Sequence, residues 1–281
     1  MDVSNMDVSN IMDRSAESII KELSTMYSVT RDIKDQEILH STSNRLKTFF
    51  RRLDYLAALD LDDKSAEDIL SAPEFDLALE SIVRFRNLYS LRLETANANS
   101  ILDSEDPWDA LKRFTHFSNY LQLALTEYQG SGLEPGDSVV FIGSGPLPLS
   151  LIMLCHQHGL RGIGIEQEPA RARLSRRVLM QLGLSDQIEI IEGNHFGLPS
   201  NGCKLVMVAA AAEPKKEIFD HLANMIPAGT KISYRIYEKG LRRLLETSSF
   251  LELPEQFEEY LRIRPKPPVN NTVIFLTKRG R

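Results

Sequence analysis

The stretch Phe141-Ile-Gly-Ser-Gly-Pro-Leu-Pro-Leu-Ser150 decides how the second half of this chain folds. It follows the apolar run 138–142, which has the composition of a buried strand, and it joins a glycine turn to a helix opened by proline. In open parallel sheets, such a unit lets the backbone approach a ligand closely at the carboxyl ends of the strands. We therefore expect a ligand at this turn.

The turn departs from the two commonest nucleotide-binding patterns. A dinucleotide fingerprint requires glycine at position 148, which is proline here. Methyltransferases that use S-adenosylmethionine usually carry an acid at position 141 and a small residue at 147, where this chain has Phe141 and Leu147. The sequence therefore predicts a nucleoside site that belongs to neither majority class.

Short apolar strands and helices alternate after residue 130. The predicted strands lie near 138–142, 161–166, 187–192, 204–209 and 230–236, and the predicted helices near 147–159, 169–182 and 214–225. Connections this short favour right-handed crossovers and a doubly wound parallel sheet. The apolar, β-branched segment 271–277 is expected to pair back as the last strand.

The first half of the chain has a different pattern. Apolar residues recur at helical spacing and predict four or five packed helices, and Gly130-Ser-Gly132 marks a boundary. We predict a disordered extension at 1–10, a helical domain at 11–130 and a Rossmann-like S-adenosylmethionine-binding domain at 131–281. The fold class is thus α/β, with a doubly wound sheet preceded by an N-terminal helical domain.

Composition excludes several partners. A formal net charge of −6 over 281 residues argues against nucleic acid and anionic membranes. The chain has no run approaching the roughly 20 apolar residues of a transmembrane helix, and its start lacks the pattern of a signal peptide. Two cysteines do not make a disulfide framework, so we expect a reducing cytoplasm.

Two polar residues follow predicted strands at the positions where a nucleoside binds. Glu166 ends the second strand about 20 residues after the glycine turn, where an acid accepts hydrogen bonds from ribose hydroxyls. The alternative is an acid that caps the next helix, a role that Glu168 fits equally. Asn194 follows the third strand and is placed to meet an adenine amino group through its carbonyl oxygen. It fits a simple turn as well.

The glycine turn 141–149 also resembles the signature of the nicotianamine synthase family. Other segments resemble that family in the same order along residues 75 to 278, namely Asp106-Pro-Trp-Asp109, Phe117-Ser-Asn-Tyr-Leu-Gln-Leu123, Ala211-Ala-Glu-Pro-Lys-Lys216, Tyr234-Arg-Ile-Tyr237 and Pro268-Val-Asn-Asn-Thr272. The resemblance implies transfer of 3-amino-3-carboxypropyl groups from S-adenosylmethionine to an amino-acid amine, with release of methylthioadenosine. The implied product is a nicotianamine-type metal chelator.

The resemblance also implies the catalytic residues. Glu94 aligns with the family's catalytic glutamate and Tyr120 with its tyrosine partner, and together they would take a proton from the acceptor amine and orient it. The segment 114–120 should line the acceptor chamber. From the residues alone, Glu94 also fits a solvated helix face, and Tyr120 fits a core aromatic.

Further binding residues are predicted around these two. The donor-binding residues that we predict are Gly143, Ser144, Gly145, Pro146, Leu147, Glu166, Asn194 and Ala209. The substrate-binding residues that we predict, for carboxylates of donor or acceptor, are Tyr234, Arg235, Asn270 and Asn271. Arg235 fits a surface ion pair equally, and the two asparagines fit a turn into the last strand. S-adenosylmethionine is then a co-substrate, the enzyme needs no metal, the partner is an amino-acid acceptor, and a homodimer is left open.

Three features are given structural roles. Cys155 and His158 share a helical face, but no second ligand pair accompanies them, so we do not predict a metal site. His195 is interpreted as a histidine on the rim of the site. The basic cluster of Arg171, Arg173, Arg176 and Arg177 is interpreted as the outer face of a solvated helix.

Two other functions remain to be separated from the transferase. A small-molecule methyltransferase would release adenosylhomocysteine in place of methylthioadenosine. A non-catalytic module that binds S-adenosylmethionine would have no use for a proton acceptor such as Glu94. A dehydrogenase that uses NAD is disfavoured by Pro148.

Overall fold

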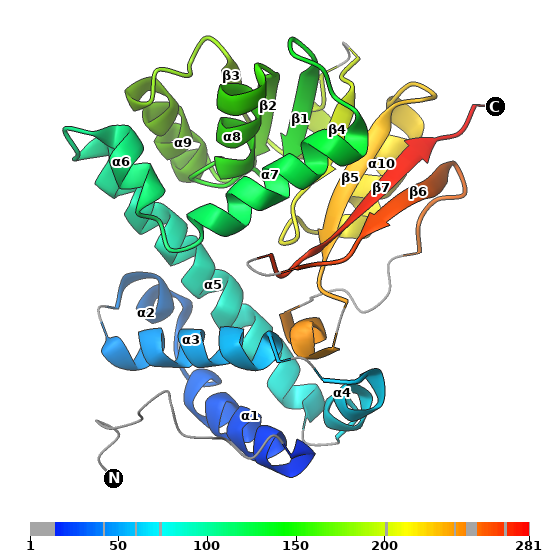
Figure 1. Cartoon of the computed structure of the whole chain (residues 1–281). Coiled ribbons are helices and arrows are strands. Elements are labelled where there is room, and N and C mark those ends of the chain that lie inside the picture. Colours follow the sequence, from blue (N-terminus) through cyan, green and yellow to red (C-terminus); the bar gives the residue numbers. More distant parts are fainter. Residues whose placement is uncertain are drawn as a thin grey trace.

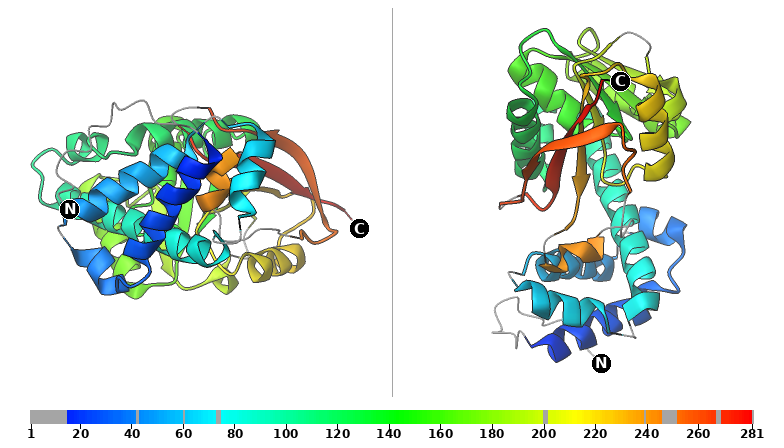
Figure 2. Two further views of the ribbon diagram at one scale, coloured as in Figure 1. Left: turned by 90° about the horizontal axis from the view of Figure 1, so that it is seen from below. Right: turned by 90° about the vertical axis from the view of Figure 1, so that its right-hand side faces the viewer.

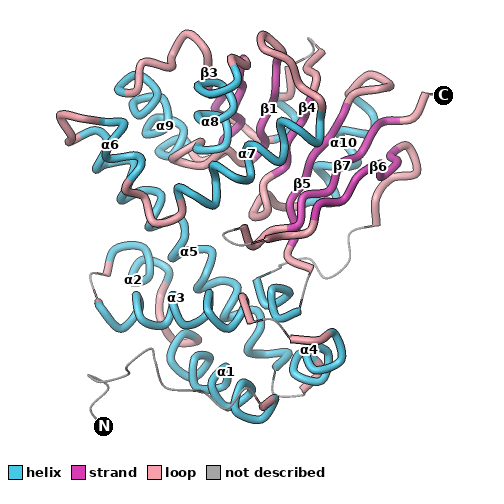
Figure 3. The backbone as a smooth tube through the Cα atoms, in the orientation of Figure 1, coloured by secondary structure: helices cyan, strands magenta, loops and turns pink. Residues whose placement is uncertain are grey.

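A computed structural model of the chain describes residues 15–41, 43–59, 61–72, 75–199, 202–238, 240–245, 252–266 and 269–280. The extension predicted at residues 1–10 lies outside the described residues. Strands gather in one part of the molecule, and the other part is built from helices (Figure 3). None of the described helices has the length and hydropathy needed to cross a lipid bilayer.

The described residues form seven helices before the first strand, rather than the four or five that the periodicity predicts. Two of the seven are only six residues long, which is too short to show a helical period in the sequence. The helices are α1 (Ala16–Thr30), α2 (Asp35–His40), α3 (Asn44–Ala57), α4 (Asp63–Leu70), α5 (Phe75–Leu102), α6 (Pro107–Lys112) and α7 (Phe117–Ser131).

Helix α5 is 28 residues long and connects the two parts of the molecule. In Figure 1 it starts among the lower helices, which are α1 to α4, and rises diagonally to α6 in the part of the molecule that contains the sheet. Near its start, Ala78 and Ile82 belong to the core of the lower helices. Near its end, Ala98 and Ile101 belong to the core under α8 and α9. The middle of α5 therefore lies between two packed cores.

The sheet has seven strands in the order β3-β2-β1-β4-β5-β7-β6. The strands are β1 (Ser138–Ile142), β2 (Arg161–Glu166), β3 (Ile188–Glu192), β4 (Leu205–Val208), β5 (Lys231–Ile236), β6 (Phe257–Ile263) and β7 (Thr272–Lys278). The first five are parallel, and they confirm the predicted strands within a residue or two. The last predicted strand is confirmed as β7.

The predicted fold class, helices followed by a doubly wound sheet, is confirmed, but the sheet is mixed rather than wholly parallel. β7 pairs antiparallel with both β5 and β6. The segment between β6 and β7 is too short for a crossover helix, so the chain returns antiparallel. β6 was not predicted, because its residues after Phe257 are mostly exposed and charged at the edge of the sheet.

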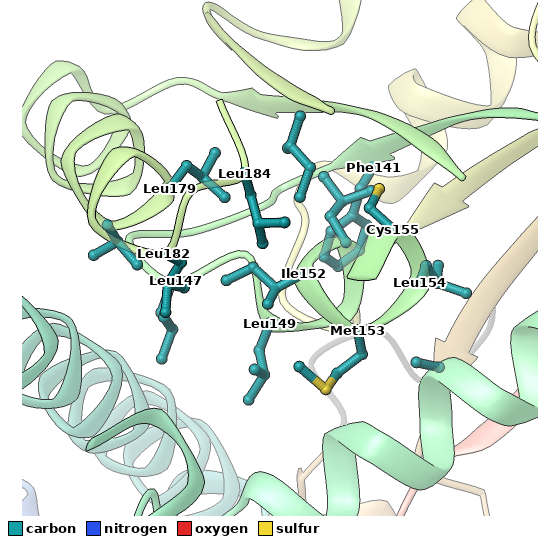
Figure 4. Close-up of a cluster of buried hydrophobic side chains, with 14 of the residues drawn as sticks. Phe141, Leu147, Leu149, Ile152, Met153, Leu154, Cys155, Leu179, Leu182 and Leu184 are labelled. Carbon is teal, nitrogen blue, oxygen red and sulfur yellow. The ribbon is translucent and has the colours of Figure 1, made fainter. Parts of the chain in front are cut away.

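Helices cover both faces of the sheet, as its alternating side chains require. Val139 and Phe141 of β1 face one layer of helices, in which α8 (Leu149–His158) and α9 (Pro169–Gln181) lie. Val140 and Ile142 face α10 (Lys215–Met225) on the other side. Figure 4 shows the side chains of this first layer, with Phe141 beside Cys155 of α8 and, to the left, Leu179 of α9 and the following Leu182 and Leu184.

The chain after β5 leaves the sheet and enters the group of lower helices. There it forms a short helix, η2 (Gly240–Leu245), which lies among α3, α4 and α5 (Figure 2). Tyr237 and Leu241 are buried in the same core as Ile19 and Leu53. The lower helices are thus tied to the sheet by a second connection besides α5. The limits predicted for the helical and Rossmann-like domains stay a prediction.

Candidate active site

A cavity of about 420 Å³ lies between the lower helices and the carboxyl ends of the parallel strands. Its volume is within the range of small-molecule sites, roughly 300–1,000 Å³. The sheet side is formed by residues that end or follow β1 to β5, and the other side by α3, α5 and the start of α7. The sequence predicts a ligand at this same edge of the sheet.

The glycine turn forms the floor of the cavity. Gly143 has φ 78° and Gly145 has φ 72°, a region that favours glycine. A Cβ at Gly143 would lie 3.0 Å from the Cβ of Ala212, and one at Gly145 would lie 3.2 Å from Oε2 of Glu94. The predicted Ser144, Pro146 and Leu147 line the cavity as well, and all three are buried. Both glycines are therefore needed for the turn to lie this close to its neighbours.

Glu166 lies beside this turn with its carboxylate buried. Its Oε2 accepts from the N–H of Gly145 at 3.0 Å, and its Oε1 accepts from the N–H of Glu168 at 2.9 Å. Arg171 Nη1 lies 3.9 Å from the same carboxylate. Glu168 is the residue that caps α9, through the N–H of Ala170. Glu166 therefore holds the turn in shape, and the remaining lone pairs of its oxygens are available to a ligand.

Asn194 follows β3 and Ala209 follows β4, so the two residues lie on opposite sides of the glycine turn that follows β1. Both line the cavity. The Oδ1 of Asn194 accepts from the N–H of Phe196 at 3.1 Å and thereby shapes the short helix η1 (His195–Gly197). The turn-forming alternative for Asn194 is thus present in the structure. An adenine at this position would meet the amide nitrogen of Asn194 or the second lone pair of its Oδ1.

Glu94 and Tyr120 meet inside the cavity, although 26 residues separate them. The Tyr120 hydroxyl donates to Oε1 of Glu94 at 2.9 Å. Burial raises the pKa of Glu94 to about 7, in spite of that bond and of the nearby Arg86. Burial and the charge of Glu94 raise the pKa of Tyr120 well above its usual value, so the phenol keeps its proton. The pair is thus a proton acceptor whose pKa lies near neutrality, with a fixed donor holding one of its oxygens.

The two residues predicted on β5 point to opposite faces of the sheet. Arg235 lines the cavity, but its guanidinium is already engaged. It donates to both oxygens of the buried Glu127 of α7, at 3.0 and 2.8 Å, and to the hydroxyl of Ser150 at 2.7 Å. It is therefore a buried structural ion pair, not a surface one. Tyr234 does not line the cavity, which corrects that prediction, because its ring packs edge-on against Phe219 under α10.

Asn270 and Asn271 both line the cavity, immediately before β7. Asn271 is buried, and its Nδ2 has no hydrogen-bond partner among the described residues. A buried amide that lacks a partner is expected to receive one from a ligand. Both asparagines therefore line the cavity, and both also lie in the segment that leads into the last strand.

Several lining residues were not predicted. They come from elements that share no motif with the glycine turn: Asp54, Arg86, Asn87, Ser90, Arg171 and Tyr237. Burial, together with Arg86, lowers the pKa of His116, so its ring is neutral at pH 7. Arg171 is corrected from a solvated residue to one at the site, while Arg173 and Arg177 are exposed as predicted. Only the prediction that 114–120 lines the chamber pointed toward this side.

The three features that we interpreted as structural do not include the Glu94–Tyr120 pair. His158 stacks on Tyr128, with ring centroids 3.9 Å apart. His195 lines the cavity and is buried against Phe196, further inside than a rim position. Among the described residues, no group of three His, Cys, Asp or Glu side chains is arranged to hold a metal ion.

Known proteins with similar sequences or structures point to one family. L-histidine 2-aminobutanoyltransferase of Yersinia pestis is 22% identical over 215 residues, which cover 74% of this chain and 80% of that protein. Nicotianamine synthase 1 of Hordeum vulgare is 33% identical over 92 residues, 31% of this chain and 28% of that enzyme. The chain thus aligns with less than a third of the length of this plant synthase.

Solved structures match over a greater length. A glutamate-to-glutamine variant of MtNAS in complex with S-adenosylmethionine superposes with a TM-score of 0.83 at 29% identity, covering 93% of this chain and 98% of that one. MtNAS in complex with MTA and tNA gives a TM-score of 0.80 at 29% identity, covering 94% and 97%. The family model described as "Nicotianamine synthase protein" matches residues 12–281. Because this match spans nearly the whole sequence, the chain belongs to the nicotianamine synthase family, whose members are S-adenosylmethionine-dependent aminocarboxypropyltransferases.

Proposed function

We propose that this protein moves 3-amino-3-carboxypropyl groups from S-adenosylmethionine to the amine of an amino acid, releasing methylthioadenosine and building a nicotianamine-type chelator. The observation that carries the proposal is the Glu94–Tyr120 pair in the cavity above the glycine turn. A non-catalytic binding module has no need of a proton acceptor held at that place with a pKa near neutrality. An amine methyltransferase would also need one, and it is told apart by its by-product, adenosylhomocysteine.

The proposed reaction is a displacement at carbon. The acceptor nitrogen attacks the γ-carbon of the methionine chain, the bond from that carbon to sulfur breaks, and its electrons neutralise the sulfonium to give the thioether of methylthioadenosine. Which carbon reacts depends on which one lies in line with the nitrogen, so the protein's task is mainly to position the two substrates.

Glu94 is the proposed base in this step. Tyr120 holds Oε1, and Oε2 faces the glycine turn, as its 3.2 Å distance from a Cβ at Gly145 indicates. An acceptor amine between Oε2 and the donor would give its proton to Glu94 as the new bond to carbon forms. A carboxylate with a pKa of about 7 takes up that proton at neutral pH more readily than one with an ordinary pKa.

The donor would lie along the turn. We propose that Glu166 accepts from the ribose, that Asn194 and Ala209 border the adenine, and that Gly143 to Leu147 contact the rest of the nucleoside. Asn270 and Asn271 are proposed to contact a carboxylate of donor or acceptor. Arg235 is proposed to support the wall through Glu127, since its fork is already occupied.

Mass spectrometry of the purified protein tests the proposal. The protein is incubated with S-adenosylmethionine and with separate acceptors, glutamate and histidine included. Methylthioadenosine together with an acceptor that has gained one or more aminocarboxypropyl units is the expected result, and the mass gain gives the number of units. Adenosylhomocysteine and a methylated acceptor would instead identify a methyltransferase.

A further inference from the structure

The end of the cavity beyond Glu94 is lined by charged and polar side chains that the transfer step does not use. Arg86, Ser90 and Glu94 are four residues apart on α5 and all line the cavity, so they share one face of that helix. At a rise of about 1.5 Å per residue, the backbone positions of Arg86 and Glu94 are about 12 Å apart. The charge of Arg86 acts on the Glu94 carboxyl, so the two side chains extend toward each other across this distance, and a molecule with its amine at Glu94 has Arg86 within reach of the neighbouring carboxylate.

Asp54 of α3 lines the same end of the cavity. Phe50, one turn earlier on α3, stacks on Tyr89 of α5 with ring centroids 4.6 Å apart. That contact places the Phe50–Asp54 face of α3 against the part of α5 that carries Arg86. Arg86 in turn lies over the ring of Tyr237, 4.9 Å from its centroid, so it is held between α5 and the segment after β5.

Neither of these two charged groups is fully satisfied by the protein. Asp54 Oδ1 and Arg86 Nε are buried atoms with no hydrogen-bond partner among the described residues. The buried Arg235, by contrast, is paired with Glu127 through two hydrogen bonds. Burial raises the pKa of Asp54, and the charge of Arg86 offsets only part of that. Buried polar atoms without partners cost free energy in the free protein, and a ligand that supplies the partners recovers it.

We propose that Arg86 and Asp54 form an acceptor subsite, in which Arg86 binds the acceptor's carboxylate and Asp54 accepts a hydrogen bond from a nitrogen on its side chain. The inference rests on the proposed transfer function. The acceptor is then an amino acid whose side chain carries an N–H donor, such as an imidazole or an amine. An acidic side chain would put a second carboxylate against Asp54 in a poorly solvated place, and such like-charge contacts are unfavourable.

The test compares acceptors on the wild-type protein and on two matched variants. Asp54→Asn keeps the shape of the side chain and removes its charge, and Asp68→Asn makes the same change at an exposed position of α4, outside the cavity. Release of methylthioadenosine gives kcat/KM for histidine and for glutamate. Calorimetry in the presence of methylthioadenosine gives the Kd of each acceptor independently of turnover.

The wild-type protein is expected to prefer histidine to glutamate by at least about tenfold. Asp54→Asn should lower kcat/KM for histidine by about 10- to 100-fold, the range for a hydrogen bond to a charged group, and leave glutamate unchanged or improved. Asp68→Asn should behave as wild type. An unchanged affinity for S-adenosylmethionine in Asp54→Asn shows that the variant is folded.

Two failures are distinguishable. If methylthioadenosine is released but glutamate is preferred, or Asp54→Asn affects both acceptors alike, the subsite is wrong and the transfer function stands. If no acceptor yields methylthioadenosine, the proposed function fails, and calorimetry alone decides on the subsite. In that case, weaker binding of histidine to Asp54→Asn than to the wild type supports the subsite. Equal affinity of the wild type for histidine and glutamate, or binding of neither, overturns the subsite.

Discussion

Replacing Glu94 by glutamine should raise the stability of the protein at high pH while it removes activity. Burial raises the pKa of Glu94 from 4.5 to about 7. The folded state therefore holds a proton that the unfolded state releases between these values, and the stability tied to this carboxyl falls as pH rises from about 4.5 to 7. At about 1.36 kcal/mol per pKa unit, the loss reaches up to about 3 kcal/mol at pH 8.

Glutamine removes the buried charge and keeps the shape. At pH 8 the variant avoids that loss, but its contact with the Tyr120 hydroxyl is weaker by about 1 kcal/mol, so it should be about 1–2 kcal/mol more stable than wild type. For a chain of this size, that is an increase in Tm of about 2–8 °C. At pH 5 wild-type Glu94 is protonated and neutral, so the two proteins should melt at nearly the same temperature.

Transfer should fall by about 10²–10⁴-fold, the usual contribution of a general base, while the affinity for S-adenosylmethionine is retained. The assay is thermal melting at pH 5, 6, 7 and 8, combined with release of methylthioadenosine and calorimetry of the donor. Glu189→Gln, at an exposed position of β3, is the matched control. A Tm difference that is the same at pH 5 and pH 8 would refute the burial argument, and near-normal turnover would remove Glu94 from the mechanism.

Other changes test the rest of the site. Gly145→Ala should lower transfer strongly, because its Cβ would lie 3.2 Å from Glu94 Oε2. Its strained backbone should also lower the free energy of unfolding in urea by about 1–3 kcal/mol. Gly136→Ala, which has open space around it at φ 91°, should lose a similar free energy of unfolding and retain full turnover. Glu166→Gln should weaken donor binding by about tenfold or more by calorimetry, since one acceptor becomes a donor toward the N–H groups of the turn, and an unchanged Kd would contradict the ribose assignment. Arg235→Met should lose about 3–5 kcal/mol of unfolding free energy, because Glu127 is left buried without its partner, and adding Glu127→Leu should restore most of that loss. If the single variant has the same urea midpoint as the wild type, the ion pair does not stabilise the fold.

The local pattern of the sequence was sufficient for most of the sheet. Strands β1 to β5 are short apolar runs between turns, and such runs can be recognised without knowing which distant residues pack against them. The errors occur at the edge, where most residues of β6 are exposed, and in the short helices that have no period of their own. In both cases the pairing and packing partners, which are distant in the sequence, decide the structure.

β5 shows how far the site itself could be predicted. Tyr234 and Arg235 are neighbours on the strand and face opposite sides of the sheet, and of the two only Arg235 lines the cavity. Choosing between them requires knowing that α7 covers the face to which Arg235 points, where Glu127 lies. Asp54 and Arg86 gave no signal at all, because they belong to helices far from the glycine turn in sequence and are brought to one cavity by the packing of α3 on α5, which includes Phe50 on Tyr89.

The position of Glu94 explains why this fold needs its helices. Its carboxylate lies between Tyr120 of α7 and the glycine turn after β1, so its placement depends on three segments at once. α5 is fixed near one end by Ala78 and Ile82 and near the other by Ala98 and Ile101, in two separate cores. A long helix held at both ends cannot rotate without disturbing one of them, because packed cores resist small displacements. The helices therefore hold Glu94, the proposed proton acceptor, over the glycine turn with the accuracy that the proposed in-line displacement requires.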